Sequence, residues 1–248
     1  MNKLYTILSN TEIAYNTYEM KLKGDTSTIT NPGQFLNIKI DDSYQNFLRR
    51  PISISTYKEN EITIIYKTFG TGTKRLSLKK RFDKLDVLSP LGNGFTVKLN
   101  NGKPILIGGG VGVPPLLGVA QKLNKNNIKF DVVLGFNNKY DVFLEAKFRS
   151  LADKVYIATM DGTYGNKGNV IDIIKTMNLD FDYYYACGPE KMLHALVKEG
   201  YRGQLSFEER MGCGFGACMG CSHKTIDSYK RICKEGPVLE SSEVFICE

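Results

Sequence analysis

Residues 104–115 read PILIGGGVGVPP, an apolar run followed by a glycine-rich loop and two prolines. The run predicts a buried strand over 104–107, and the pattern from Pro114 to Leu123 predicts a helix. Glycines let a backbone approach a pyrophosphate closely, and the free N–H groups and dipole of the following helix favour the anion. A proline in the first helical turn loses no hydrogen bond. The stretch therefore predicts a dinucleotide-binding loop, with a plain strand-to-helix turn as the alternative.

Strand and helix patterns alternate after this loop. Strands are expected over 130–136, 155–159, 183–187 and 204–207, and helices over 142–151, 169–177 and 189–199. Such alternation predicts a doubly wound parallel sheet. Cys187-Gly188-Pro189 stands at the end of a predicted strand, where ligands bind in such sheets. A small buried cysteine before a helix is the alternative there.

The chain before the loop has a different texture. Strand-like runs lie at 38–40, 52–55 and 61–67, with turns expected at 31–33, 58–60 and 89–92. Many short strands with Gly and Pro turns predict a small barrel. We therefore expect three modules, with β, α/β and cysteine-rich character in turn. Their boundaries are 1–98, 99–207 and 208–248, with a linker near 100–103.

Five of the six cysteines lie in the last 36 residues. Four of them follow the spacing C-x4-C-x2-C-x11-C, which begins like the plant-type [2Fe–2S] motif. These are Cys213, Cys218, Cys221 and Cys233. Small residues between the ligands allow the loop to wrap closely and aim N–H groups at sulfur. A zinc site is the alternative, although zinc ligands usually come as two C-x2-C pairs.

The remaining candidate side chains are expected to have no part in the chemistry. Cys247 is interpreted as a free terminal thiol. His223 is interpreted as a solvated loop residue and His194 as a structural or surface residue. A tail this short buries little core, so a metal centre would help it to fold.

Composition excludes several classes. Of 248 residues, 42% are hydrophobic and 24% charged, which is typical of a folded protein and not of disorder, collagen or coiled coil. No run approaches the roughly 18 apolar residues of a membrane span, and Met1–Ser9 does not resemble a signal peptide. We expect a cytoplasmic protein, and disulfides are rare in the cytoplasm. The net charge of +7 is scattered, which suits anionic nucleotides better than nucleic acid.

The barrel, the glycine loop and the Cys-Gly-Pro triplet together resemble the ferredoxin–NADP reductase superfamily. Pro32-Gly33-Gln34-Phe35 and Arg50-Pro51-Ile52-Ser53 are similar to its barrel strands, and Ile65-Tyr66-Lys67 with Gly72-Thr73 to its next flavin-binding segment. The resemblance implies a six-stranded antiparallel FAD-binding barrel, with Arg50 on the pyrophosphate and Ser53 near the reactive edge of the flavin. Ile52 stands where the family has an aromatic residue. From the residues alone, an arginine on a solvated strand and a glycine-rich hairpin remain the alternative.

The same resemblance implies the nicotinamide nucleotide site. Its residues would be Gly109, Gly110, Val111 and Gly112 of the loop, with Cys187, Gly188 and Pro189. Asp161 lies where NADP-specific relatives carry Ser-Arg. A carboxylate there would repel a 2′-phosphate and accept a hydrogen bond from a ribose hydroxyl, so NAD is expected.

The tail from Glu208 to Leu239 resembles the electron-transfer subunit of NAD-dependent (class 1B) dihydroorotate dehydrogenase, and the resemblance covers the full chain. It implies one FAD and one [2Fe–2S] cluster per subunit, held without catalytic residues of its own. Electrons would pass from dihydroorotate through FMN on a catalytic partner, the cluster and FAD to NAD+, in the pyrimidine (UMP) pathway. The assembly would be a heterotetramer with two of each subunit.

Two expectations concern the segment around the cysteines. Residues 212–221 are expected to contact the catalytic partner, and residues 208–211 to face the flavin. Other functions stay open at this point. One is an NADH-dependent flavin and iron–sulfur reductase serving another acceptor, and another is a zinc-stabilised nucleotide-binding protein. A nucleic-acid binder is the weakest, because aromatic and basic residues do not interleave.

Overall fold

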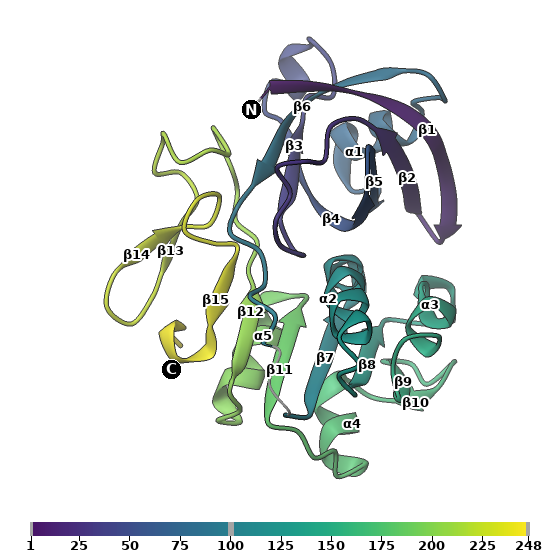
Figure 1. The fold of residues 1–248 in the computed structure, drawn as a ribbon, viewed down its shortest axis with the longest axis vertical. Helices are drawn as coiled ribbons and strands as arrows, with labels where there is room; N and C mark the ends of the chain where they lie inside the picture. Colours follow the sequence, from purple (N-terminus) through teal and green to yellow (C-terminus); the bar gives the residue numbers. More distant parts are fainter. Residues whose placement is uncertain (1, 99–101, 247–248) are drawn as a thin grey trace.

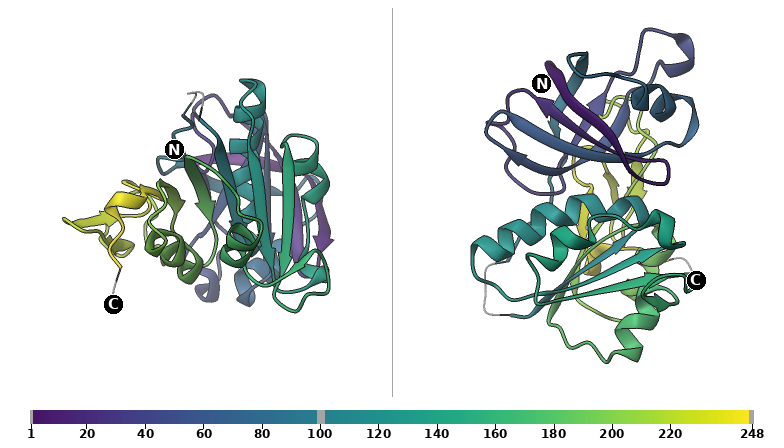
Figure 2. Two further views of the ribbon diagram at one scale, coloured as in Figure 1. Left: turned by 90° about the horizontal axis from the view of Figure 1, so that it is seen from below. Right: turned by 90° about the vertical axis from the view of Figure 1, so that its right-hand side faces the viewer.

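The computed structural model describes residues 2–98 and 102–246, so that Cys247 lies outside the described residues. A closed β-barrel stands over a second, open sheet, and the C-terminal segment lies beside both (Figure 1). Figure 2 shows helix α2 (Val113–Lys125) running between the barrel and the open sheet. The predicted β plus α/β architecture is therefore confirmed.

The barrel has six antiparallel strands in the order β1-β2-β5-β4-β3-β6. Ile62, Ile64 and Tyr66 of β5 point into it and are almost fully buried, as the alternation along this strand predicts. Ile65 points outward and is buried against the first turns of α2. The strands are β1 (Asn2–Ala14), β2 (Thr17–Lys23), β3 (Phe35–Ile38), β4 (Arg50–Lys58), β5 (Glu61–Lys67) and β6 (Lys84–Leu91).

Two details of the barrel differ from the sequence prediction. The turn expected at 89–92 begins only at Gly92 (φ +74°), because Leu91 pairs with Phe35 and continues β6. Gly72 and Thr73 lie in helix α1 (Gly70–Ser77), not in a hairpin. In addition, β1 and β2 were not among the predicted strands, and β1 is 13 residues long where short strands were expected.

The open sheet has the strand order β10-β9-β8-β7-β11-β12-β15, and all pairs are parallel except the last. Helices α2 and α3 cover one face and α4 and α5 the other, each over its own apolar core. This is the predicted doubly wound arrangement. The strands are β7 (Pro104–Gly109), β8 (Asp131–Phe136), β9 (Lys154–Thr159), β10 (Asn166–Lys167), β11 (Tyr183–Cys187), β12 (Gly203–Ser206) and β15 (Val238–Glu240). The other helices are α3 (Glu145–Arg149), α4 (Val170–Thr176) and α5 (Glu190–Lys198), with short 3-10 turns η1 (Tyr44–Asn46), η2 (Gly110–Gly112), η3 (Lys139–Asp141) and η4 (Ser241–Glu243).

Helix α2 packs directly on the barrel. The Ser55 hydroxyl of β4 donates a 3.0 Å hydrogen bond to the carbonyl of Pro114. A Cβ on Gly118 would lie 2.9 Å from Cβ of Pro32, so a glycine is needed for this close approach. The contact fixes the glycine loop at the N-terminus of α2 directly beneath the barrel strands.

The C-terminal segment is joined to both other parts of the molecule. It forms a small hairpin of β13 (Ser222–Lys224) and β14 (Tyr229–Arg231), and then adds β15 to the edge of the open sheet. Asn93, just after the barrel, donates to the carbonyls of Glu235 and Val238 and accepts from the Val238 N–H. Among the residues that the structure describes, no helix is long and apolar enough to span a membrane.

Candidate functional site

A cavity of about 200 Å³ lies where the barrel, the open sheet and the C-terminal segment meet. Its walls are mostly apolar, with Ser53 and Glu208 among the few polar side chains, which suits a flat aromatic ring system. We call it the flavin pocket. Its lining residues are Phe35, Pro51, Ile52, Ser53, Ile65, Tyr66, Val111, Cys187, Ser206, Phe207, Glu208, Glu209, Met211 and Pro237.

Arg50 and helix α1 form a cradle that fits a pyrophosphate. The Arg50 guanidinium lies against Gly72, where a Cβ would be 2.5 Å from Nε. Only a glycine leaves room for this contact at the first turn of α1, where backbone N–H groups are free. A guanidinium beside a helix N-terminus is suited to an anion. The residues present therefore fit the phosphate end of FAD.

The other predicted flavin residues divide into two groups. Pro51, Ile52, Ser53, Ile65 and Tyr66 line the flavin pocket. Thr73 uses its hydroxyl within the chain, since it donates to the Phe69 carbonyl and accepts from the Phe69 N–H. The Lys67 side chain does not line the flavin pocket and pairs instead with Asp141.

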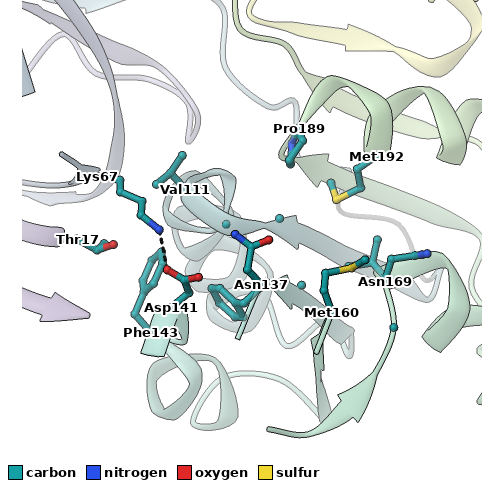
Figure 3. A pocket seen from close by; sticks show the side chains of 16 residues that line it. Thr17, Lys67, Val111, Asn137, Asp141, Phe143, Met160, Asn169, Pro189 and Met192 are labelled. Carbon is teal, nitrogen blue, oxygen red and sulfur yellow. Dashed lines mark hydrogen bonds and ion pairs between the residues drawn. The ribbon is translucent and has the colours of Figure 1, made fainter. Parts of the chain in front are cut away.

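A second cavity, of about 230 Å³, lies at the carboxyl ends of the parallel strands (Figure 3). Gly109, Gly110, Val111 and Pro189 line it, as predicted for the nicotinamide nucleotide. Val111 lines the flavin pocket as well. The two cavities therefore share one side chain as a common wall, so that a dinucleotide in the second cavity would lie next to a flavin in the first.

Gly112 and Gly188 allow the main chain to pack closely beside this nucleotide pocket. A Cβ on Gly112 would lie 2.4 Å from the carbonyl carbon of Cys187, and a Cβ on Gly188 would lie 3.0 Å from the Gly109 N. These glycines bring the end of β11 against the glycine loop. Gly112 and Gly188 therefore support the wall of the predicted site and do not line the cavity themselves.

Asp161 does not line the nucleotide pocket, although its neighbour Met160 does. Its carboxylate accepts hydrogen bonds from the N–H and hydroxyl of Thr163, which hold the pKa of Asp161 below its usual value. The side chain is thus a charged carboxylate at the rim of the pocket. Its role in choosing NAD over NADP remains a prediction.

Cys187 ends β11 with its thiol in the flavin pocket. Burial, helped by the nearby Glu208 carboxylate, raises the pKa of Cys187 to about 12. The thiol is therefore neutral at physiological pH. A neutral thiol packs beside a ring system without acting as a nucleophile.

The four cysteines of the predicted cluster lie on one loop and on the short turn after β14. The N–H groups of Ala217 and Cys218 each donate to Sγ of Cys213 at 3.3 Å, and the Cys213 N–H donates to Sγ of Cys218 at 3.4 Å. Cys221 and Cys233 are both buried, and they are close enough for Cys221 to help raise the pKa of Cys233. The cysteines thus form two pairs, 213/218 and 221/233.

This pairing fits a two-iron cluster, in which each iron takes two thiolates. Burial and the neighbouring Cys221 raise the pKa of Cys233 to about 12, so the Cys233 thiol ionises only if a cation binds it. Burial also raises the pKa of Cys213, but N–H donors of Cys218, Phe215 and Ala217 outweigh it and lower that pKa to about 6. Over residues 2–98 and 102–246, no three metal-binding side chains converge as a single-ion site would require.

Several residues of these sites were missed by sequence reasoning, and one was assigned to the other pocket. Lys67, predicted for the flavin, forms an ion pair of 2.6 Å in the nucleotide pocket with Asp141, which was missed, and Asn137 lies beside it (Figure 3). Asn169 and Met192 complete the wall. Only Asn169 carried a visible signal, since it begins α4 with a capping box to Asp172. His223 was predicted to be solvated, but it is buried. Its ring nitrogen Nδ1 lies 3.0 Å from Oε1 of Glu209, and the two atoms form a hydrogen bond.

Two family models match this chain, one over the cysteine segment and one over the nucleotide-binding segment. Residues 208–245 match the iron–sulfur cluster binding domain of dihydroorotate dehydrogenase B. Residues 106–198 match the oxidoreductase NAD-binding domain. Both matches fall on the segments whose geometry is described above.

Solved structures share the fold. A chain of the NADH-dependent reduced ferredoxin–NADP oxidoreductase superposes with a TM-score of 0.87 at 28% identity, over 97% of this chain and 89% of the other. A cytochrome P450 reductase from Amycolatopsis gives 0.71 at 19% identity, over 80% and 65% of the two chains. The second likeness concerns the fold alone.

Curated relatives extend over nearly the whole chain. The dihydroorotate dehydrogenase B (NAD(+)) electron transfer subunit of Fusobacterium nucleatum subsp. nucleatum is 46% identical over 97% of both chains. The protein of the same name from Bacillus pumilus is 46% identical over 98% of both. This chain belongs to the family of electron transfer subunits of the NAD(+)-dependent dihydroorotate dehydrogenase B.

Proposed function

We propose that the chain passes electrons between a dihydroorotate-oxidising partner subunit and NAD+, through a [2Fe–2S] cluster and FAD. One observation carries the proposal. The flavin pocket shares Val111 with the nucleotide pocket on one side, and on the other its wall at Met211 leads directly into Cys213 of the cysteine loop. Three redox groups would therefore lie in a row, with the flavin between the other two.

The order of the groups matches their chemistry. A nicotinamide exchanges two electrons as a hydride, whereas a [2Fe–2S] cluster takes one electron, and a bound flavin can do both. The role of the chain itself is to bind these redox groups and to orient them. Arg50 and the first turn of α1 would hold the pyrophosphate, and the two cysteine pairs would hold the irons. Cys187, as a neutral thiol, would pack where the two ring systems meet.

The partner subunit would supply dihydroorotate oxidation on an FMN, in a heterotetramer with two copies of each subunit. The loop 212–221 is the surface we propose for this contact, because Phe215 and Met219 are exposed there beside the cysteines. We also propose a cytoplasmic location, in pyrimidine synthesis, because thiols stay reduced there and the four cysteines can then bind the cluster.

The proposal is tested by purifying the chain without oxygen and measuring its visible spectrum, its iron content and its EPR spectrum after reduction with NADH. We expect a flavin spectrum, two irons per chain and the EPR signal of a reduced [2Fe–2S] cluster. A colourless protein that contains zinc would contradict electron transfer. Co-purification with an FMN protein that oxidises dihydroorotate supports the dehydrogenase, whereas reduction of a different acceptor without that partner would favour a stand-alone reductase.

A further inference from the structure

The side chain of Asn37 is buried, with 1% of the residue exposed, and it has no hydrogen-bond partner among the described residues. Both its Nδ2 and its Oδ1 lack a hydrogen bond among the residues described. A buried amide without a partner is destabilising and rare in folded proteins. Another buried amide of the barrel, that of Gln34, is satisfied, since its Oε1 accepts from the Thr30 N–H and its Nε2 donates to the Gly92 carbonyl. Asn37 therefore requires a partner that residues 2–98 and 102–246 do not supply.

The position of Asn37 shows where this partner lies. It is on β3, two residues after Phe35, so both side chains stand on the outer face of the barrel. Its cross-strand neighbour is Pro51, and both Phe35 and Pro51 line the flavin pocket. On the side away from the flavin pocket, the Asn37 side chain lies next to Gly214 of the cysteine loop. Asn37 thus stands on the boundary between the flavin pocket and the cluster.

The amide points its nitrogen at the cysteine loop. A Cβ on Gly214 would lie 2.1 Å from Nδ2 of Asn37, but 3.1 Å from its Cγ. Gly214 directly follows Cys213 and has φ +77°, a conformation that favours glycine. The glycine therefore leaves the space that the amide fills beside the first cysteine of the cluster.

We infer that the Asn37 side-chain amide donates an N–H···S hydrogen bond to a sulfide of the bound cluster, beside Cys213, and so raises the reduction potential of the cluster. This inference rests on the function proposed above. The chemistry fixes the direction of the bond, because thiolates and bridging sulfides accept hydrogen bonds and cannot donate them. A donor stabilises the more negative, reduced state more than the oxidised state. Asn37 is thus a positioning and tuning residue, not a ligand.

The test is Asn37→Leu in the complete complex, with the cluster potential measured by an EPR-monitored redox titration. At the potential that half-reduces the native cluster, we expect the ratio of reduced to oxidised cluster to fall about tenfold, which is about 59 mV for one electron. The matched control is Asn124→Leu near the C-terminal end of α2, because Nδ2 of Asn124 donates to the Leu151 carbonyl of the α/β domain. The control should leave the cluster potential unchanged.

A second measurement does not depend on how well the variant folds. The native chain is made with asparagine labelled with ¹⁵N in the side-chain amide, and the nuclear couplings of the reduced cluster are recorded by pulsed EPR. We expect a coupling from this amide that changes with the label. An unchanged cluster potential in Asn37→Leu, or a shift of the flavin potential alone, would overturn the inference. Loss of the cluster from the native chain would instead overturn the proposed function.

Discussion

Nζ of Lys67 on β5 and Oδ1 of Asp141 on η3 lie 2.6 Å apart, and this ion pair joins the barrel to the α/β domain at the wall of the nucleotide pocket (Figure 3). The Asp141 side chain is 10% exposed and that of Lys67 is 35% exposed. The pair therefore has a buried end and an open end. It ties the two halves together while it keeps an ammonium in reach of a bound dinucleotide.

Lys67→Met should leave the Asp141 carboxylate buried without its partner. We expect the free energy of unfolding to fall by about 1–2 kcal/mol, less than the roughly 3–5 kcal/mol of a fully buried pair, because Lys67 is partly solvated. The double variant with Asp141→Asn should recover part of this loss. Denaturant unfolding of the two single variants and the double variant measures the coupling, and additive effects would contradict it.

The same substitution should weaken NADH binding. Lys67 is the one cationic side chain among the described residues that line the nucleotide pocket, so it is the natural partner of the phosphates. We expect KM for NADH to rise about tenfold with little change in kcat, since a charged hydrogen bond contributes about 1.5–3 kcal/mol. Lys58→Met, on the exposed end of β4, is the control and should bind NADH normally.

The fold was largely predictable because its signals are local. The alternation along β5, the glycine loop before α2 and the strand–helix repeat after it each depend on neighbours in the sequence, and all appear in the structure. Strand β1 escaped prediction because Tyr5 and Ile7 are its only fully buried residues. Patterning cannot reveal a long strand that buries so little of its length.

The site was predictable only where a motif marks it. The cysteine spacing and the RPIS segment carry their own signals. Lys67 and Asp141 are 74 positions apart, and no local pattern links them. Lys67 was assigned to the flavin by its neighbours in the sequence, and Asp141 looks like an ordinary surface charge until folding brings the two together. Asn37 likewise looks like the exposed residue of an alternating strand. Its outer face is buried only because the cysteine loop, some 180 residues later, covers it.

Asp161→Arg should shift the nucleotide preference toward NADPH. The Asp161 carboxylate stands at the rim of the nucleotide pocket beside Met160, and reversal of its charge would attract a 2′-phosphate. We expect the ratio of kcat/KM for NADPH over NADH to rise about tenfold or more. The control is Asp153→Arg, because Asp153 precedes the opposite end of β9. An unchanged ratio in Asp161→Arg would remove Asp161 from the specificity site.

Cys221→Ser should abolish the EPR signal of the cluster and leave the flavin bound, because Arg50 and Gly72 lie on the barrel. Loss of the cluster should also loosen the cysteine loop alone. We expect amides of residues 213–221 to exchange faster with deuterium, while those of β15 stay protected by pairing with β12. Cys247→Ser serves as the control thiol. A cluster of normal intensity in Cys221→Ser would contradict the ligand assignment.

Alkylation of Cys187 should show the pH dependence of a buried thiol. Burial raises its pKa from 9.0 to about 12, so the thiolate is about a thousandfold rarer at pH 8 than in the unfolded chain. The logarithm of the iodoacetamide rate should therefore keep rising by one per pH unit toward pH 12 in the folded chain. In guanidinium it should level off near pH 9. Steric shielding alone would lower the rate without moving this plateau, so mass spectrometry of the Cys187 peptide separates the two causes.

The same shift links Cys187 to stability. Because the folded-state pKa lies above the unfolded one, its contribution is complete below about pH 9 and is lost as the pH rises from 9 toward 12. Cys187→Ala removes this titration, so its unfolding free energy should decline less steeply than that of the native chain over that range. Equal slopes in denaturant unfolding would show that the thiol already ionises in the folded chain. Cys187 would then be a thiolate at the flavin pocket rather than the neutral packing group that its burial predicts.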